Sequence, residues 1–208
     1  STYTEAHLCD YQSIYWSDSS NFEGFSQSGL AETRIDTTFN DTISGFAPNK
    51  DAFFVFKDRS TAVLAGTPST GDVSVEVLES DTGCASHNSI QEINGALVWL
   101  DAVNGFVSCV AGRLPTLIGY PVNNFMRENN KLPNAQKLRF KAAKACNYRL
   151  KDLYVCYVPC GTIDFDGTTL VPSANSNSKM FVFDYSEAKM GQIRRCWYLW
   201  DSIQFTGG

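Results

Sequence analysis

The clearest candidate for nucleophilic chemistry is a cysteine followed three residues later by a histidine, Cys84 and His87. A thiol beside an imidazole is the pairing that activates cysteine nucleophiles. The residues around them, Ser86, Asn88 and Ser89, are equally typical of a polar loop ahead of a strand. Nothing in the sequence marks Cys84 as a thiolate of lowered pKa. We therefore predict that the chain has no catalytic site and is not an enzyme.

Metal-ligating residues are also present, but in incomplete sets. Cys156 and Cys160 could supply two zinc ligands from one strand, whereas a structural zinc site needs four. The stretch Asp164–Gly167 is similar to the start of a calcium loop but lacks the distant glutamate of an EF-hand. We predict core or strand-end cysteines, acidic turn residues, and neither a metal site nor a cofactor.

Sugar chemistry is the third candidate, and it leaves two alternatives open. The turn Ser80–Gly83 is similar to the Asp-box of sialidase propellers, although no aromatic residue follows and no acid/base carboxylate pair stands out. Tyr11, Tyr15 and Trp16 lie close together before the polar stretch 17–29 and form a candidate ligand patch. The alternatives are a carbohydrate- or receptor-binding module for host attachment and, ranked lower, a sialidase-like glycoside hydrolase.

Composition limits the classes of function. The 208 residues include 17 basic and 22 acidic side chains, for a net charge of −5, which argues against recognition of nucleic-acid phosphates. The seven cysteines are odd in number and scattered, which favours reduced core residues and folding in a reducing cytoplasm. The sequence starts with no signal peptide and contains no apolar run of membrane-spanning length, so we expect no membrane partner.

Short strand signals recur along the whole chain. The clearest region runs from Ser89 to Ile118, where Asn94-Gly95 and Asn104-Gly105 divide apolar runs and are typical of type I′ hairpin turns. It predicts a four-stranded antiparallel meander. Further strands are expected at 14–16, 43–46, 52–56, 61–65, 73–77, 138–146, 153–158, 180–185 and 196–201, with a loop at 17–29 and surface insertions at 120–137, with at most one or two helical turns, and at 161–178.

Aromatic-rich hairpins recur at intervals of about 40 to 50 residues, as in proteins built by radial repetition. A set of short motifs occurs in a fixed order within them. These are Tyr15-Trp16-Ser17, Val55-Phe56-Lys57 with Ser60, Leu64 and Gly66, Gly83-Cys84 with Ser89-Ile90, Asn94-Gly95 with Trp99-Leu100, Asn104-Gly105-Phe106, Phe181–Asp184 and Trp197–Asp201. In this order the sequence resembles the β-propeller virion proteins of tailed bacteriophages, of the tail-accessory, neck or nozzle type.

The resemblance implies an all-β fold of four-stranded meanders arranged as a complete or partial propeller. It implies one domain over residues 1–208, whether or not these are cut from a longer chain. The function it implies is that of a structural virion protein, folded in the host cytoplasm. Such a protein assembles with copies of itself and with other tail or neck proteins into a ring or tube. DNA would pass through that ring or tube without sequence-specific binding.

Ten residues are expected to maintain this fold rather than to react: Trp16, Phe56, Lys57, Ser60, Gly83, Cys84, Trp99, Gly105, Trp197 and Trp200. The aromatic rings of Phe56, Trp99 and Trp200 are expected between blades, where they bury large areas. Lys57 and Ser60 are expected to satisfy the backbone groups of the Asp58-Arg59 turn. Gly66, Gly83 and Gly105 are expected at turns that a side chain would strain.

Overall fold

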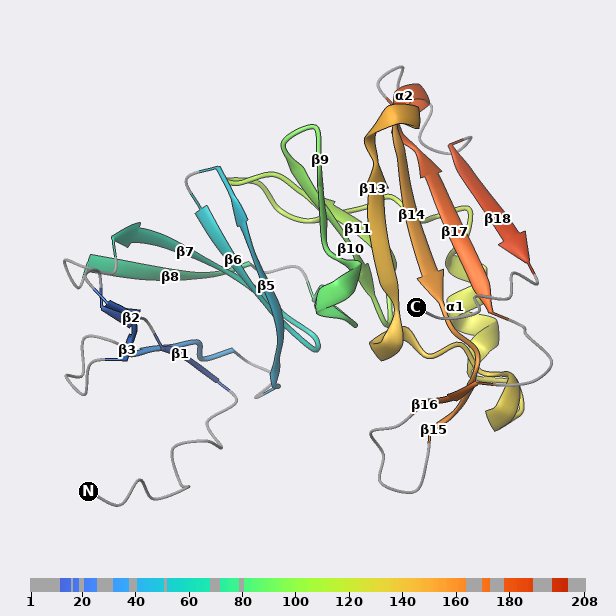
Figure 1. Ribbon diagram of the computed structural model, residues 1–208, viewed down its shortest axis with the longest axis horizontal. Coiled ribbons are helices and arrows are strands. Elements are labelled where there is room, and N and C mark those ends of the chain that lie inside the picture. The colour runs from blue at the N-terminus through green and yellow to red at the C-terminus, as the bar shows by residue number, and fades with distance from the viewer. Residues whose placement is uncertain are drawn as a thin grey trace.

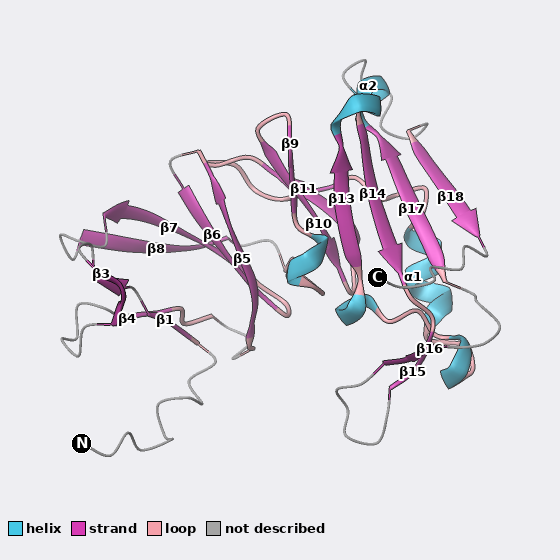
Figure 2. Ribbon diagram, viewed as in Figure 1, coloured by secondary structure: helices cyan, strands magenta, loops and turns pink. Residues whose placement is uncertain are grey.

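Three four-stranded antiparallel sheets follow one another along the chain in the computed structural model (Figures 1 and 2). Three two-stranded pairs accompany them in the described part of the chain. The all-β prediction is confirmed. The structure describes residues 12–15, 17–18, 21–25, 32–37, 41–50, 52–67, 72–78, 81–163, 170–172, 178–188 and 196–201.

The first sheet has the order β5-β6-β7-β8, so each strand pairs with its neighbour in sequence. Its central strand β6 reads Ala-Phe-Phe-Val-Phe-Lys, a run of aromatic and β-branched residues that suits a strand buried on both faces. The Asp58-Arg59 turn joins it to β7, where the Lys57 N–H donates to the Ser60 carbonyl at 2.8 Å. The strands span β5 Ile43–Asn49, β6 Ala52–Lys57, β7 Thr61–Thr67 and β8 Asp72–Leu78.

The second sheet is the predicted meander of residues 89–118, with the order β9-β10-β11-β12. Asn94 and Gly95 have φ angles of 51° and 79°, which confirms a type I′ turn. The type I′ turn expected at Asn104-Gly105 is wrong, because only Gly105 has a positive φ, 85°, and Asp101 pairs with Gly105 across a three-residue loop. The elements are the 3₁₀ turn η3 His87–Ser89, β9 Gln91–Ile93, β10 Ala96–Asp101, β11 Gly105–Cys109 and β12 Thr116–Leu117.

The third sheet has the order β13-β14-β17-β18 and carries a hairpin between its second and third strands. The expected strand at 138–146 starts only at Lys144, because residues 140–142 form a 3₁₀ turn. The elements are β13 Lys144–Tyr148, β14 Leu153–Val158, β17 Lys179–Asp184 and β18 Trp197–Asp201, with the hairpin β15 Gly161–Ile163 and β16 Leu170–Pro172. The short helical elements are α1 Asn123–Asn129, α2 Tyr185–Ala188, η4 Asn134–Gln136, η5 Phe140–Ala142 and η6 Arg149–Lys151.

Helix α1 lies in the expected insertion at 120–137 and has the predicted length of about two turns. It is more than a surface decoration, because Val122 and Met126 are buried in the same apolar cluster as Phe181 and Trp197. The insertion therefore contributes to the core of the third sheet.

The N-terminal part contains two short strand pairs, β1 with β4 and β2 with β3. Their bounds are β1 Ser13–Tyr15, β2 Ser17–Asp18, β3 Asn21–Phe25 and β4 Glu32–Arg34. The loop predicted at 17–29 is therefore wrong for residues 17–18 and 21–25. Its Ser, Asn and Gly residues are poor strand formers, but backbone pairing of Ser17 with Phe25 needs no particular side chain.

The core consists of apolar layers between successive sheets. Between the first and second sheets the rings of Phe56 and Trp99 lie 4.8 Å apart, and both are fully buried. Between the second and third sheets Phe106 lies 4.5 Å from Trp197 and 5.3 Å from Phe181. The expected placement of Trp200 is wrong, because this ring is 49% exposed on the far face of β18 while Trp197 faces the core.

Candidate functional site

Lys57 carries a fully buried positive charge beside the first sheet. Its Nζ donates to the Ile35 carbonyl at 3.0 Å and to the Thr37 hydroxyl at 3.2 Å, and lies 3.5 Å from Oδ1 of Asp41. The Asp41 side chain is only 6% exposed. Lys57 contributes to the Asp58-Arg59 turn through its backbone N–H, which bonds the Ser60 carbonyl, whereas its side chain reaches toward segment 35–41.

The Asp41 side chain, which lies outside the Asp58-Arg59 turn, accepts hydrogen bonds from polar groups of that turn. Its carboxylate accepts the Arg59 N–H at 2.7 Å and the hydroxyls of Thr37 and Ser60 at 2.8 and 3.2 Å. Burial raises the pKa of Asp41, but these hydrogen bonds and the charge of Lys57 outweigh it and bring the pKa below its usual 3.8. Ser60 therefore acts through Asp41, and the four side chains tie segment 35–41 to the β6–β7 turn.

The segment that holds Gly83 and Cys84 runs between the first two sheets. The Cys84 N–H donates to the Lys57 carbonyl at 2.9 Å, and the Trp99 indole N–H donates to the Gly83 carbonyl at 2.8 Å. A Cβ on Gly83 would lie 2.3 Å from the Asp58 carbonyl oxygen, so only glycine fits. Gly83 is thus required by close backbone approach rather than by a turn. Gly66, with a φ of 113°, lies within β7 and not at a turn.

Asp101 closes the β10–β11 loop and contacts the same segment. Its carboxylate accepts the N–H groups of Val103 and Asn104 at 2.7 and 2.5 Å and that of Gly83 at 2.6 Å. Burial raises its pKa above the usual 3.8 despite these three bonds. Asn104 adds a bond from its amide to the Asp81 carbonyl at 2.9 Å. The turn that is similar to an Asp-box is thereby joined to this loop.

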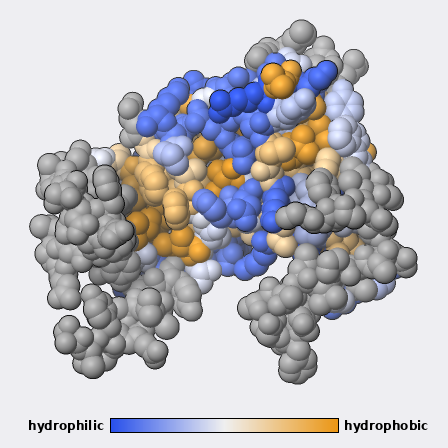
Figure 3. All heavy atoms as spheres, viewed as in Figure 1, coloured by the Kyte–Doolittle hydropathy of each residue, from blue (hydrophilic) through white to orange (hydrophobic). Residues whose placement is uncertain are grey.

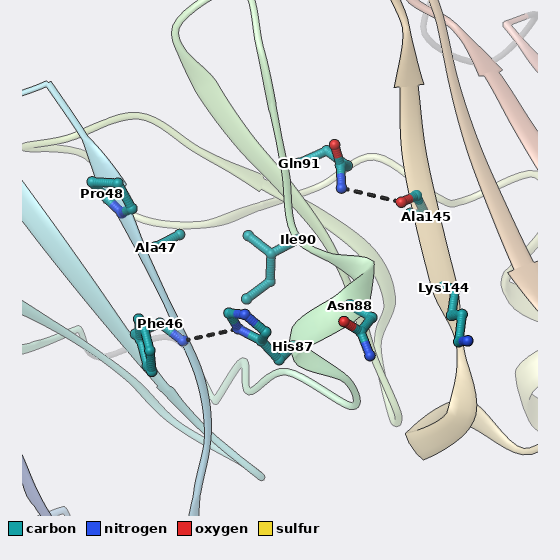
Figure 4. Close-up of a pocket in the computed structure, with 9 residues that line it drawn as sticks. All are labelled: Phe46, Ala47, Pro48, His87, Asn88, Ile90, Gln91, Lys144 and Ala145. Atoms are coloured by element: carbon teal, nitrogen blue, oxygen red, sulfur yellow. Dashed lines mark hydrogen bonds between the residues drawn. The ribbon is translucent and has the colours of Figure 1, made fainter.

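Cys84 and His87 do not form a catalytic pair. Cys84 is fully buried, its Sγ donates to the Ser86 carbonyl at 3.1 Å, and burial raises its pKa from 9.0 to about 12. The thiol therefore stays protonated at neutral pH. The imidazole of His87 bonds elsewhere, because its Nδ1 accepts the Phe46 N–H at 3.4 Å (Figure 4).

The cysteines considered as zinc ligands lie in the apolar layer between the second and third sheets. Burial raises the pKa of Cys156 to about 12, which disfavours the thiolate that zinc requires. Within the described ranges no cluster of three or more His, Cys, Asp or Glu residues could hold a metal ion. Asp164–Gly167 lie outside the described residues, as do Tyr11 and Trp16 of the candidate ligand patch and the side chain of Tyr15.

An open groove of about 480 Å³ lies where the first strands of the three sheets approach one another. In Figure 4, β5 with Phe46, Ala47 and Pro48 lies on one side of the groove and β13 with Lys144 and Ala145 on the other, with His87, Asn88 and Ile90 between them. Ala47 points toward Ile90, whereas the Phe46 ring and the Lys144 side chain lie on the far sides of their strands. Gln91 completes the lining. The groove is the candidate site, because apolar residues (Ala47, Ile90 and Ala145) and polar residues (His87, Asn88 and Gln91) line it together.

Side chains from neighbouring sheets seal the strand edges around this groove. The Gln91 amide donates to the Ala145 carbonyl at 3.1 Å, and the Asn147 amide donates to the Glu92 carbonyl at 2.8 Å. On β5, the Phe46 N–H is bound by His87, and Pro48 has no N–H to offer. Backbone groups occupied in this way disfavour pairing with an added strand at these positions.

Sequence reasoning missed the groove residues Phe46, Asn88, Gln91 and Lys144. They come from segments up to about a hundred residues apart, and none belongs to a recognisable motif. The one available signal was that amide residues occur at or next to the first strands, at Asn49, Gln91 and Asn147. Only the structure shows that Gln91 and Asn147 bridge sheets.

Comparison with known proteins does not assign the chain to a family. No family model matches the sequence, and no curated protein is detectably similar to it. Among the described residues, no helix has the length and apolar character needed to cross a membrane.

Proposed function

We propose that this chain is a structural component of a bacteriophage tail or neck, built as a complete or partial β-propeller. It would assemble with copies of itself and with other tail proteins into a ring or tube for genome passage. The observation that carries the proposal is the succession of three four-stranded antiparallel sheets, packed face to face, whose first strands share one groove.

This arrangement is what radial repetition requires. A propeller blade is a four-stranded antiparallel sheet, and its neighbours pack on both of its faces around a central axis. Here β5, β9 and β13 come first in their sheets, and the contacts of η3 and β9 bring all three toward one side. Figure 1 agrees, because β8 and β18, the last strands of the first and third sheets, lie at opposite ends of the molecule.

The virion assignment rests on the ordered resemblance of short motifs, and the roles of their residues fit it. Lys57, Gly83, Trp99 and Trp197 hold segments and sheets together by buried hydrogen bonds and ring contacts. A structural protein depends on such buried contacts between segments and sheets rather than on reactive side chains. The described residues of the motifs therefore support a scaffold.

The outer face of the third sheet offers a contact surface. Tyr148 and Trp200, at opposite corners of this face, are 45% and 49% exposed, and hydrophobic surface is visible over the upper part of β14 and β17 (Figure 3). Exposed apolar faces on otherwise well-packed proteins mark sites of protein contact. We assign this face to the neighbouring sheet or subunit of the assembly.

The test is the protein content of purified phage particles. Quantitative mass spectrometry is expected to find the chain at a fixed copy number per particle, and imaging is expected to locate it in the tail or neck. Absence from washed particles, or presence only as a soluble protein in the infected cell, would contradict the proposal.

A further inference from the structure

The outer face of the third sheet carries the side chains that alternate along each strand with the core residues. Pairing across β13, β14, β17 and β18 sets these side chains in rows: Lys144, Tyr157, Met180 and Trp200; then Cys146, Val155, Val182 and Tyr198; then Tyr148, Leu153 and Asp184. Only Met180 and Val182 are buried within this face. None of these side chains belongs to an apolar core cluster of the described residues.

This face is largely apolar and carries no net charge. Its two charged side chains, Lys144 and Asp184, have opposite signs and lie in different rows. Aromatic side chains on its two edge strands are close to half exposed, at 45% for Tyr148, 44% for Tyr198 and 49% for Trp200. A broad exposed surface of this kind is typical of a protein contact.

The opposite end of the stack of sheets is already covered in part. The far face of the first sheet has Val55, Ala62 and Leu64 at its centre. Ile35 packs on these residues, and its carbonyl accepts a hydrogen bond from the buried Nζ of Lys57 at 3.0 Å. Figure 1 shows β1 and β4 at this end of the molecule, away from the third sheet. The third sheet is therefore the end that another sheet can extend.

We infer that the outer face of the third sheet docks on the same face of a second copy of this chain. The inference rests on the assignment of this face to a neighbouring sheet or subunit, made above, and names that subunit. The second sheet provides the precedent within the fold, because apolar layers cover both of its faces, with Trp99 in one layer and Leu100 in the other. A second copy gives the third sheet the same cover on its outer face.

Two properties favour a symmetric pair over a head-to-tail contact. A head-to-tail contact would need the far face of the first sheet, where Ile35 already packs. A two-fold pair uses only the open face, and two-fold dimers are the commonest assemblies of identical chains. Because Lys144 and Asp184 balance each other, pairing the face with itself brings together no excess of like charge. One sheet face is small beside an obligate interface, so we expect association in the micromolar range.

Sedimentation velocity of the purified full chain, over a micromolar concentration series in reducing buffer, tests this. Dimers and no larger species are expected, because a two-fold contact uses the face on both copies. The exposed thiol of Cys146 reports on the same face. Its alkylation, read by peptide mass spectrometry apart from the other cysteines, is expected to slow at the concentrations where dimers form.

Two variants place a charge at opposite corners of the face, Tyr148→Glu and Trp200→Glu. Each is expected to weaken dimerisation by at least about tenfold, because both copies carry the change and aromatic residues dominate interface energies. Circular dichroism checks that both variants fold, as their exposure predicts. The matched control is Val75→Glu, at a residue 37% exposed on the far face of the first sheet, which is expected to leave dimerisation unchanged.

Several outcomes would overturn the inference: a chain that stays monomeric, dimers that survive both Tyr148→Glu and Trp200→Glu, or dimers that Val75→Glu abolishes. Larger species that Val75→Glu abolishes would show a head-to-tail contact, which also overturns it. None of these outcomes bears on whether the chain is found in phage particles, so the proposed function is tested separately.

Discussion

At the scale of single residues, the most consequential side chain is the buried Lys57. Replacing it with Met keeps the volume but leaves Asp41 and the Ile35 carbonyl without their cation and donor. Removing one partner of a buried pair typically costs about 3–5 kcal/mol of unfolding free energy. We expect Lys57→Met to lose at least about 2 kcal/mol in urea unfolding, since hydrogen bonds to Asp41 remain. Lys151→Met, at an exposed position, is the control, and equal stability of both variants would contradict the assignment.

The acid side of the stability curve follows from two carboxyl groups with opposite pKa shifts. The pKa of Asp41 is lowered in the folded chain. Its contribution to the free energy of unfolding is therefore present above the usual pKa of 3.8 and is lost as the pH falls through the folded-state pKa. The pKa of Asp101 is raised in the folded chain. Its contribution to the free energy of unfolding is therefore present below pH 3.8 and is lost as the pH rises through the folded-state pKa.

Unfolding free energies measured from pH 2 to pH 7 test this. Asp41→Asn is expected to flatten the fall in stability below pH 3.8, whereas Asp101→Asn is expected to change the slope only above it. If both variants change the free energy of unfolding over the same pH range, the pKa values of Asp41 and Asp101 are not shifted in opposite directions.

At the scale of elements, segment 81–86 is the joint between the first two sheets. Its path depends on Gly83, where a Cβ would lie 2.3 Å from backbone of the β6–β7 turn. Gly83→Ala is expected to cost about 1–3 kcal/mol or more, as in overpacked cores, because backbone and not a flexible side chain blocks the space. The control is Gly112→Ala, because a Cβ there meets open space while the φ of 76° still strains the backbone. In thermal unfolding Gly112→Ala is expected to lose less stability than Gly83→Ala.

At the scale of the whole molecule, the proposed assembly can be tested at the outer face of the third sheet. Trp200→Asp is expected to leave the melting temperature of the isolated chain nearly unchanged, because the ring is 49% exposed. It is expected to reduce co-assembly with copies of the chain or with tail proteins by at least about tenfold, because tryptophan is enriched among the residues that dominate interface energies. Tyr120→Asp, at a residue that is 62% exposed and belongs to none of the strands of this sheet, is the control. Equal assembly of both variants, measured by sedimentation and incorporation into particles, would contradict the role of this face.

Much of the fold was determined by local sequence. The second sheet was predicted strand by strand, because Asn94-Gly95 fits positive φ at two successive residues and apolar runs flank it. Predictions failed where local composition and tertiary contacts disagree. Segment 138–146 reads as a strand, but residues 140–142 form a 3₁₀ turn, and Trp200 is exposed although Trp197, three residues earlier, is buried.

The partners of long-range contacts were decided only by the tertiary structure. That Lys57 pairs with Asp41, that Asp101 caps Gly83, and that Asn88 and Lys144 share one groove depends on how sheets stack. The sequence by itself determined most strands of the three four-stranded sheets, because backbone preference and side-chain alternation are properties of neighbouring residues. Which side chains bridge neighbouring sheets, such as those of Gln91 and Asn147, was set by the packing of three sheets, since no local preference encodes contacts across separate sheets.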